Sequence, residues 1–565
     1  MGRAAMPITP WLKSMRSAIG RLAERVILLE GWRRLATAFA AGAVAALALQ
    51  PLNILLALVP GFALLVWLID GSDGAGTRPR LSLLWQAFSL GWAFGFGYFL
   101  MGLWWLGSAF IEGGEQFIWL LPFGVVGLPM GLAIFMGCGV TVARVLWSGG
   151  ALRLLALAFG LGLSEFARAR LLTGFPWNSF GQVFADHLAL AQGASLIGTE
   201  GMGVLAILMF AAPATFATGR TVAAKLVPTL SAALLLVSVW SFGYVRLIPT
   251  GGIGGAPAQI GMAPGVLVRV VQPGVTQADR SRPGSGAEIL NRFLTLTESA
   301  PGIQSRGLAG VTHLIWPEAP FPFVLDREPK ALAAISQRLG ETVLVTGAIR
   351  AEEAPEQARR FHFFNAIQVF DRDGIVGSYD KVHLVPFGEY LPFGHVLRAL
   401  GIQEFVDVIG GFTSGAARRP LEIPGLPASV PLICFETIFP HELVGHAPLS
   451  GAVFVNVTND AWFGQTFGPY QHLAQARLRA IEFGYPMVRA ANSGISAMID
   501  PHGRLLTQLP LGKADVFDAR LPLPLRTTLY RRTIQYSYAS VMILIGVIAF
   551  WGVLRSRRPR TFYHV

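Results

Sequence analysis

The sequence predicts a polytopic helical membrane protein with an α/β domain inserted before its last span. Of the 565 residues, 53% are hydrophobic and only 14% are charged, whereas soluble proteins carry about 25% charged residues. Apolar stretches of membrane-spanning length recur before residue 251. Between residues 251 and 525, charged residues return and strand-like runs alternate with helical ones. Together these three observations exclude a wholly soluble or a disordered chain.

Eight apolar segments have the length that a bilayer crossing requires, which is about 20 helical residues. They lie at residues 35–50, 52–70, 84–107, 117–140, 152–170, 194–217, 224–246 and 535–554. The basic, amphipathic residues before them run directly into the first segment, and no cleavable signal sequence is evident. We therefore predict four parts: a basic N-terminal segment (1–34), a seven-helix membrane domain (35–250), an α/β domain (251–525), and a C-terminal helix with a basic tail (526–565).

The net charge of +12 lies at the two ends of the chain. Residues 1–34 hold seven basic and two acidic residues, and residues 526–565 hold seven arginines and no acidic residue. A nucleic-acid-binding protein would carry such an excess on one face of a folded domain, so we expect no nucleic acid partner. Basic residues beside apolar segments instead indicate the cytoplasmic side of a membrane. With the N-terminus in the cytoplasm, residues 251–525 lie outside it.

Two groups of basic residues fall on the outer side in this topology. The arginines that follow residue 525 are less troubling, because long translocated domains respond weakly to local charge. Arg168 and Arg170 lie close to Glu165 and are followed by GFPWN at 174–178. Two interpretations of Glu165 stay open, an anchor at the lipid interface or part of a substrate pocket.

The chain has two cysteines. Cys138 lies in an apolar run, where we expect a buried structural residue within the bilayer. Cys434 lies in a region of mixed composition, so no disulfide between the two is expected. The sequence shows no cluster of His, Cys and Asp at metal-ligand spacing. We therefore predict no metal and no organic cofactor.

Runs rich in Val, Ile and Phe alternate with segments of helical period in residues 251–525. The expected strands lie within 266–274, 312–320, 342–350, 365–374, 429–440 and 451–460. The expected helices lie at 287–299, 328–340 and 472–484. This alternation predicts a layered α/β domain.

Three residues follow strand-like runs, where a sheet can fix the backbone of a catalytic group. They are Glu318 after THLIWP, Lys381 after SYD, and Cys434 after SVPLI. If they converge, Cys434 can attack a carbonyl carbon while Glu318 removes the thiol proton. Lys381 favours the thiolate and can stabilise the oxyanion of the tetrahedral intermediate. Taken alone, each is more often a turn, surface or core residue, so the prediction depends on all three.

The sequence around these three residues resembles a known superfamily. WPE (316–318), YDKVHLVPFGEY (379–390) and CFE (434–436) follow one another as in the nitrilase or carbon–nitrogen hydrolase superfamily. The stretches VNVTNDAWFG (455–464) and QHLAQARLRAIEFGYPMVRAANSGIS (471–496) are also similar to it. The arrangement of spans resembles its membrane-embedded branch, the apolipoprotein N-acyltransferases of bacterial inner membranes. This resemblance covers nearly the whole chain and implies an αββα sandwich for the α/β domain.

The resemblance implies roles for individual residues. It makes Glu318 the general base, Lys381 the oxyanion stabiliser and Cys434 the nucleophile. It also implies that Glu389 orients the lysine and that Glu436 supports the site. Alternation along a strand would place the Glu436 side chain on the same face as Cys434.

The resemblance further implies a ping-pong reaction on two lipids. The nucleophile takes an acyl chain from a phospholipid, typically phosphatidylethanolamine, as a thioester. It then passes the chain to the α-amine of a diacylglyceryl-modified cysteine at the N-terminus of a lipoprotein. No cofactor is implied, and the implied location is the bacterial inner membrane with the α/β domain in the periplasm. We expect a monomer.

Aromatic residues are candidates for lipid contact. Phe387, Tyr390 and Phe393 lie in the loop after the lysine, for which we predict a lipid-facing lid rather than ordinary packing. Phe435 stands where many members of the family have Tyr, so no hydroxyl is required there. Trp177 lies in the GFPWN stretch, although tryptophans near span ends also form interface belts.

Two other functions remain as alternatives. A membrane-tethered amidase would pass the same thioester to water, and the three candidate catalytic residues do not exclude it; eight spans, however, exceed what anchoring needs. A transporter or channel with an extracytoplasmic domain would place ionisable residues in mid-span. The predicted spans are almost free of them, so transport is not favoured.

Overall fold

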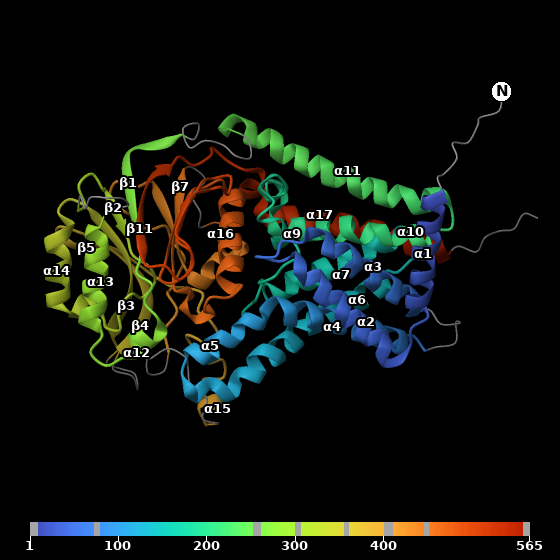
Figure 1. Ribbon diagram of the computed structural model, residues 1–565, viewed down its shortest axis with the longest axis horizontal. Helices are drawn as coiled ribbons and strands as arrows, with labels where there is room; N and C mark the ends of the chain where they lie inside the picture. Colours follow the sequence, from blue (N-terminus) through green and yellow to red (C-terminus); the bar gives the residue numbers. More distant parts are fainter. Residues whose placement is uncertain are drawn as a thin grey trace, which may run out of the picture.

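The computed structural model describes residues 10–72, 79–251, 261–299, 307–354, 361–399, 411–443, 445 and 451–557. Helices make up one half of the molecule and two β-sheets lie in the other (Figure 1). The N-terminal helix α1 (Pro10–Ile27) lies at the end far from the sheets (Figure 1). Of the three predicted domain limits, one falls between α11 (Val222–Leu247) and β1 (Met262–Gln272), and one between β11 (Asp515–Pro522) and α17 (Leu529–Arg557). The first, between residues 34 and 35, falls inside helix α2 (Gly31–Ala45).

Each of the eight predicted spans overlaps one principal helix, with limits that differ by several residues. These helices are α2 (Gly31–Ala45), α3 (Leu58–Asp70), α4 (Arg80–Leu103), α6 (Leu128–Val145), α7 (Arg153–Arg168), α9 (Ala194–Ala211), α11 and α17. Five helical stretches in the described residues are long and apolar enough to cross a membrane: Arg80–Glu112, Phe117–Val145, Ala194–Thr218, Val222–Thr250 and Tyr536–Arg555. Leu55–Asp70 is a shorter apolar helix. α2 and α7, with 15 and 16 residues, are shorter than a typical span.

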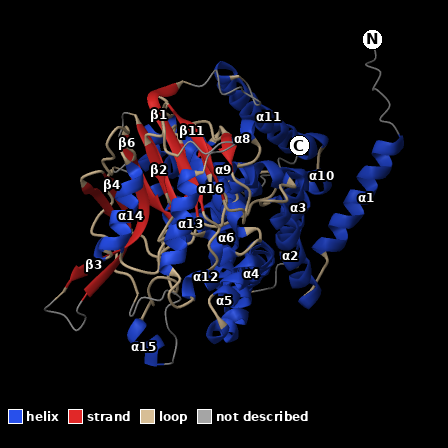
Figure 2. Ribbon diagram, turned by 60° about the vertical axis from the view of Figure 1, so that its left-hand side comes forward, coloured by secondary structure: helices blue, strands red, loops and turns tan. Residues whose placement is uncertain are grey.

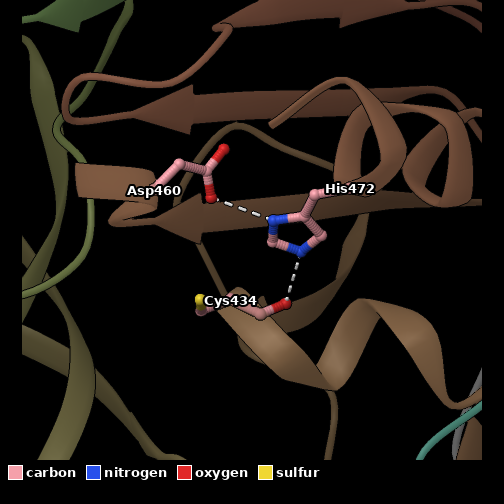
Figure 3. Close-up of side chains that lie close together, drawn as sticks. All are labelled: Cys434, Asp460 and His472. Carbon is pink, nitrogen blue, oxygen red and sulfur yellow. Dashed lines mark hydrogen bonds and ion pairs between the residues drawn. The ribbon is translucent and has the colours of Figure 1, made fainter. Parts of the chain in front are cut away.

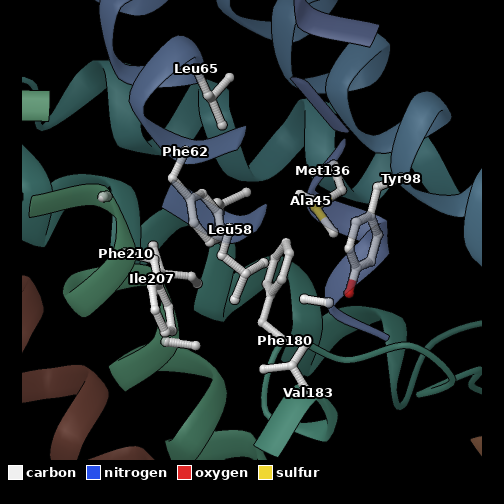
Figure 4. Close-up of a cluster of buried hydrophobic side chains, with 14 of the residues drawn as sticks. Ala45, Leu58, Phe62, Leu65, Tyr98, Met136, Phe180, Val183, Ile207 and Phe210 are labelled. Atoms are coloured by element: carbon white, nitrogen blue, oxygen red, sulfur yellow. The ribbon is translucent and has the colours of Figure 1, made fainter. Parts of the chain in front are cut away.

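Small and aromatic residues pack the membrane helices together. A Cβ at Gly42 would lie 1.8 Å from the carbonyl oxygen of Phe94, so only glycine lets α2 approach α4 this closely. Deeper in the bundle, the ring of Phe180 lies 5.2 Å from Phe62 and 5.0 Å from Tyr98 (Figure 4). Cys138, which we expected to be buried, is exposed on α6 because it faces outward from the bundle.

The α/β domain is a four-layer sandwich, αββα (Figure 2). One sheet has six strands in the order β11-β1-β2-β3-β4-β5, and the other has five in the order β10-β9-β8-β7-β6. The strands of the first are β1 (Met262–Gln272), β2 (His313–Ile315), β3 (Val343–Glu353), β4 (Phe361–Asp371), β5 (Gly374–Asp380) and β11 (Asp515–Pro522). Those of the second are β6 (Ala428–Ile433), β7 (Ala452–Thr458), β8 (Met487–Ala491), β9 (Ala497–Ile499) and β10 (Leu505–Gln508).

Alternating apolar residues hold the layers together. Val268 and Val270 of β1 belong to the same buried core between the sheets as Val455 and Val457 of β7. Helices α13 (Gly286–Glu298) and α14 (Pro329–Leu339) cover the six-stranded sheet, and the short helices α12 (Gln277–Ser281) and α15 (Gly394–Ala399) lie in its loops. Helix α16 (Gly468–Phe483) covers the five-stranded sheet and lies between it and the membrane helices (Figure 1).

The two halves share one hydrophobic core. Phe435, Ile438 and Phe439, which follow β6, are buried in the same cluster as residues of α2, α3, α4 and α9. The α/β domain is therefore packed against the membrane helices at the segment that carries the predicted nucleophile.

A buried glutamine near the start of α16 adds polar contacts across this junction. The Oε1 of Gln471 accepts hydrogen bonds from the indole nitrogens of Trp105 (3.1 Å) and Trp177 (2.8 Å). Its Nε2 donates to the carbonyl oxygens of Gln50 and Gly102, each at 3.2 Å. One side chain thus hydrogen-bonds four buried groups of the membrane domain, two of which, the Trp105 indole and the Gly102 carbonyl, also bond each other at 3.0 Å.

Replacing this glutamine tests the junction. We expect Gln471→Leu to lower the free energy of unfolding, because each buried donor or acceptor left unpaired costs about 1–3 kcal/mol. Thermal unfolding of the purified protein in detergent measures this change. The control is Gln475→Leu, one turn further along α16, where the side chain is also buried and its Nε2 has no hydrogen-bond partner among the described residues. Equal unfolding temperatures for the two variants would contradict the assignment.

Candidate active site

The three predicted catalytic residues each follow a strand. Glu318 comes three residues after the end of β2, Lys381 directly follows β5, and Cys434 directly follows β6. The carboxylate and the ammonium therefore belong to one sheet and the thiol to the other. The charges of Glu318 and Lys381 both act on the Cys434 thiol. The site thus lies where the two sheets meet.

Glu318 is placed by a close approach of two backbone segments. Its chain passes so near β3 that a Cβ at Gly347 would lie 2.5 Å from the Glu318 Cα. The amide of Gly347 donates to the Pro317 carbonyl at 3.1 Å, and Ala319 has a positive φ of 36°. Glycine is therefore required at 347, because any side chain would push the glutamate out of position. Glu318 itself is 6% exposed.

Lys381 lies between two carboxylates. Its Nζ is 2.9 Å from Glu389 and 3.4 Å from Oε1 of Glu318, and the lysine is 1% exposed. Burial opposes the charge on Lys381, but the Glu389 and Glu318 carboxylates outweigh it and raise the lysine pKa. The ammonium is therefore charged at neutral pH and available to stabilise an oxyanion.

Asn365 of β4 connects the two carboxylates, and no motif considered above includes it. Its Nδ2 donates to Oε1 of Glu318 and to Oε1 of Glu389, each at 2.7 Å. The other oxygen of Glu318 accepts from the backbone amide of Asn459 at 2.7 Å. The only signal in the sequence is a polar residue within an apolar strand, since buried polar side chains usually have a structural or chemical task.

Cys434 occupies a left-handed backbone position. Its φ is 48°, which is uncommon for a residue with a Cβ, and the residue is half-buried. Burial and the Glu318 charge raise the pKa of the thiol, although Lys381 and a hydrogen bond with Thr458 act in the opposite direction. The thiol is consequently protonated at rest and needs a base before it can attack. The sequence predicts this role for the Glu318 carboxylate, whose charge acts on the thiol.

The expected position of Glu436 is wrong. We expected it to share a strand face with Cys434, but β6 ends at Ile433 and residues 434–438 form a 3₁₀ turn. The fully buried Glu436 carboxylate turns back and accepts from the amides of Ile433 and Val382, both at 2.9 Å. It therefore ties the turn that carries the nucleophile to the segment that begins with Lys381.

A histidine lies behind the nucleophile. His472 of α16 has its Nδ1 2.9 Å from Asp460 Oδ1 and its Nε2 3.2 Å from the carbonyl oxygen of Cys434. Figure 3 shows the ring facing this carbonyl, while the sulfur points elsewhere. Arg489 donates to the second oxygen of Asp460 at 2.8 Å. Burial and Arg489 lower the pKa of His472, and Asp460 acts against them.

These groups could be mistaken for a metal site. Ligand atoms of Cys434, Asp460 and His472 lie within 4.8 Å of one another. However, both oxygens of Asp460 already accept hydrogen bonds or ion pairs from protein groups, and the cation Arg489 adjoins the set. Burial opposes the charge of Asp460, but Arg489 and His472 lower its pKa to about 2. The donor set fits a hydrogen-bonded support better than an open metal site.

The residues predicted to contact lipid divide into a partly exposed group in the loop after Lys381 and a buried group, Phe435 and Trp177. Phe387 and Phe393 are 49% and 79% exposed, and Tyr390 is half-buried, so lipid contact by this loop stays a prediction. Phe435 is buried, with its ring 6.2 Å from Phe175. Trp177 is only 1% exposed and its indole donates to Gln471. We therefore correct the prediction for Trp177, which belongs to the domain junction because its ring and its nitrogen are already in use.

Glu165 is neither an exposed anchor nor part of the candidate active site. Its Oε1 lies 2.8 Å from Arg168 Nη2, and its Oε2 accepts from the Phe180 amide at 3.2 Å. Arg168 also donates to the Trp177 carbonyl at 2.7 Å. The pair therefore holds the loop that contains GFPWN, and the nearby Arg170 pairs with Glu200 at 2.8 Å.

Comparisons with known proteins cover both halves of the chain. The family described as "Apolipoprotein N-acyltransferase N-terminal domain" matches residues 41–212, and the family "Carbon-nitrogen hydrolase" matches residues 313–531. A protein of Rhodopseudomonas palustris named "Apolipoprotein N-acyltransferase" is 42% identical over 548 residues, which are 96% of this chain and 99% of that protein. A protein of the same name from Bradyrhizobium diazoefficiens is 43% identical over 546 residues, 95% of this chain and 98% of that protein.

Among solved structures, the chain is similar to a carbon-nitrogen hydrolase from Helicobacter pylori. The TM-score is 0.34 at 15% identity, over 53% of this chain and 96% of that one. An amidase of the nitrilase superfamily from Nesterenkonia gives a TM-score of 0.32 at 18% identity, over 46% of this chain and 92% of that one.

Removing the Glu318 charge tests the electrostatics of the site. Because this charge raises the pKa of Cys434, Glu318→Gln should lower that pKa and increase the thiolate fraction at neutral pH. We expect Cys434 to react faster with iodoacetamide at neutral pH and the rate–pH profile to shift to lower pH. Glu353→Gln, at an exposed position on β3, is the control. A profile that stays in place or moves to higher pH would contradict the assignment.

Proposed function

This chain belongs to the apolipoprotein N-acyltransferase family, and we propose that it transfers an acyl chain from a membrane phospholipid to the N-terminal amine of a diacylglyceryl-cysteine lipoprotein. The acyl chain passes through a thioester on Cys434. The convergence of Glu318, Lys381 and Cys434 where the α/β domain meets the membrane helices carries this proposal. The enzyme is an acyltransferase, and its relatives of nearly full length carry that name.

In the first half-reaction the thiol of Cys434 attacks the ester carbonyl of the phospholipid. The Glu318 carboxylate accepts the thiol proton as the C–S bond forms, which the raised thiol pKa makes necessary. The oxyanion develops beside the Lys381 ammonium, whose own pKa is raised by Glu389 and Glu318. The C–O bond then breaks, Glu318 returns the proton to the leaving alkoxide, and a lysophospholipid departs.

In the second half-reaction the α-amine of the lipoprotein attacks the thioester. Glu318 accepts the amine proton as the C–N bond forms, and the C–S bond breaks to give an amide. The proton then returns to the sulfur of Cys434, so the enzyme ends as it began. A covalent intermediate lets the two lipids use the site in turn, which avoids binding both at once.

The membrane half supplies the surface on which both substrates arrive. Phe387 and Phe393 project from the loop after Lys381 and are largely exposed, which suits a lid in contact with acyl chains. Phosphatidylethanolamine is our choice of donor. All the groups in the mechanism come from one chain, which supports a monomer as the acting unit.

We place the α/β domain in the periplasm and both termini in the cytoplasm of a bacterium, across its inner membrane. The charge excess at both ends of the chain supports this orientation. Three of the five arginines that fall on the outer side have partners: Arg168 pairs with Glu165, Arg170 pairs with Glu200, and Arg531 donates to the Phe483 carbonyl. Arg78 and the arginines at 558 and 560 lie outside the described residues.

A product assay tests this function. Purified protein in detergent is incubated with phosphatidylethanolamine and a diacylglyceryl-cysteine peptide, and the peptide is analysed by mass spectrometry. We expect the mass of one acyl chain to be added at the peptide amine and an equal amount of lysophospholipid to form. Cys434→Ser should abolish both products, whereas Cys138→Ser, on the outer surface of α6, should leave both unchanged.

The same assay separates transfer from hydrolysis. A hydrolase would release free fatty acid at the same rate with or without the peptide, and the peptide would stay unmodified. Peptide acylation that persists in Cys434→Ser would contradict the role of the thiol.

A further inference from the structure

We infer that His472 is a positioning residue that holds the carbonyl of Cys434 and thereby aims the nucleophile at Glu318 and Lys381. The inference rests on the proposed function, because it assigns Cys434 the attacking thiol. Its starting point is the contact of 3.2 Å between His472 Nε2 and the Cys434 carbonyl oxygen (Figure 3). A carbonyl oxygen only accepts hydrogen bonds, so this contact requires a proton on Nε2.

The backbone at Cys434 explains why such a bond is needed. A φ of 48° on a residue with a Cβ is unfavourable and persists only when the surroundings enforce it. Rotation of the Cys434 peptide would swing the Cα–Cβ bond and move the sulfur away from the two charged groups. Glu436 fixes the amide of Ile433 just before Cys434, at 2.9 Å, and His472 fixes the carbonyl of Cys434 itself.

Three neighbours hold the ring in this position: Asp460, Arg489 and Trp177. With its proton on Nε2, the ring accepts at Nδ1 from Arg489 Nη2 at 3.2 Å, and Arg489 also donates to Asp460. Asp460 Oδ1 lies 2.9 Å from Nδ1 and accepts from the Thr458 hydroxyl at 2.9 Å. Trp177 lies against the ring with centroids 5.4 Å apart. Histidine, aspartate and arginine here are all fully or almost fully buried. This network lies behind the nucleophile, since the sulfur points away from the ring (Figure 3).

The position of the ring distinguishes this role from that of a base. A base for the thiol would contact the sulfur, whereas Nε2 contacts the carbonyl oxygen of the same residue. His472 therefore acts through the backbone of Cys434. Its neighbour Gln471 contacts the indoles of Trp105 and Trp177, so the same turn of α16 links the nucleophile to the membrane helices.

Two amide variants separate the two ring nitrogens. The amide nitrogen of glutamine can stand where Nε2 stands and donate to the Cys434 carbonyl, whereas that of asparagine reaches only the Nδ1 position. We expect His472→Asn to slow acylation of Cys434 by phosphatidylethanolamine about 100-fold at saturating donor, the scale of a reacting group misplaced by about 1 Å. The KM for the donor should stay unchanged, and His472→Gln should recover most of the loss.

A readout without lipid substrates makes the inference independent of the proposed reaction. The pH profile of Cys434 alkylation by iodoacetamide reports the charges that act on the thiol, which include Glu318, Lys381 and Asp460. If the sulfur swings away, the profile of His472→Asn should shift toward the ordinary thiol range, while that of His472→Gln should stay close to wild type. Failure of wild-type acylation would sink the proposed function, yet the alkylation profiles would still decide the role of His472.

Folding is checked by thermal unfolding, with His502→Asn as the control. His502 is also buried near a carboxylate, with Asp500 at 3.9 Å, and its carbonyl accepts from Gln192. If neither His472 variant folds, Asp460→Ala decides, because loss of both carboxylate oxygens releases Arg489 and the ring and should slow acylation. Equal rates and equal alkylation profiles for folded His472→Asn and His472→Gln, or a wild-type rate for folded Asp460→Ala, would overturn the inference.

Discussion

The structure depends on one strained turn that two domains hold in place. Cys434 takes a left-handed backbone conformation at the end of β6, and the segment after it is buried in the hydrophobic core of the membrane half. Glu436 fixes this turn from the side of β5, and His472 contacts the carbonyl of Cys434 from α16. Because these supports come from both sheets and border the membrane helices, the position of the sulfur reflects the assembly of the whole chain rather than a local preference.

The charges around the sulfur follow a simple balance. Glu318 and burial raise the pKa of the thiol, and Glu389 with Glu318 keeps Lys381 charged. In the resting site the negative charge therefore lies on the carboxylates, and the sulfur stays protonated until a substrate carbonyl arrives. Asn365 donates to both carboxylates and so fixes the position of the base, Glu318, relative to Glu389, the partner of the lysine. A neutral hydrogen-bond donor suits this position because a further charge would disturb both neighbours.

The sequence predicts the apolar helices, the layered α/β domain and the place of three residues at strand ends, since these follow from periodicity and from local sequence patterns. Of the eight predicted spans, five contain helical stretches that are long and apolar enough to cross a membrane among the described residues. The prediction fails where contacts join distant segments. Asn365 and Glu318 are 47 positions apart, and His472 and Cys434 are 38 apart, so no local pattern shows that they touch. The turn at 434–438 was predicted as strand, because CFETIF continues an apolar run and nothing local indicates a positive φ. For Trp177, an apolar loop next to a span fits a lipid contact and a buried domain junction equally well, so the local sequence does not distinguish the two.

The covalent intermediate is the central claim, and intact-mass analysis of a single turnover tests it most directly. Wild-type protein is mixed with phosphatidylethanolamine alone, and the mass of the chain is measured before and after a diacylglyceryl-cysteine peptide is added. The account predicts that one acyl chain is added on Cys434 with release of lysophospholipid, and that the adduct disappears as the acylated peptide forms. An acylated peptide that forms without any adduct on Cys434, or with an adduct that the peptide does not discharge, would contradict it.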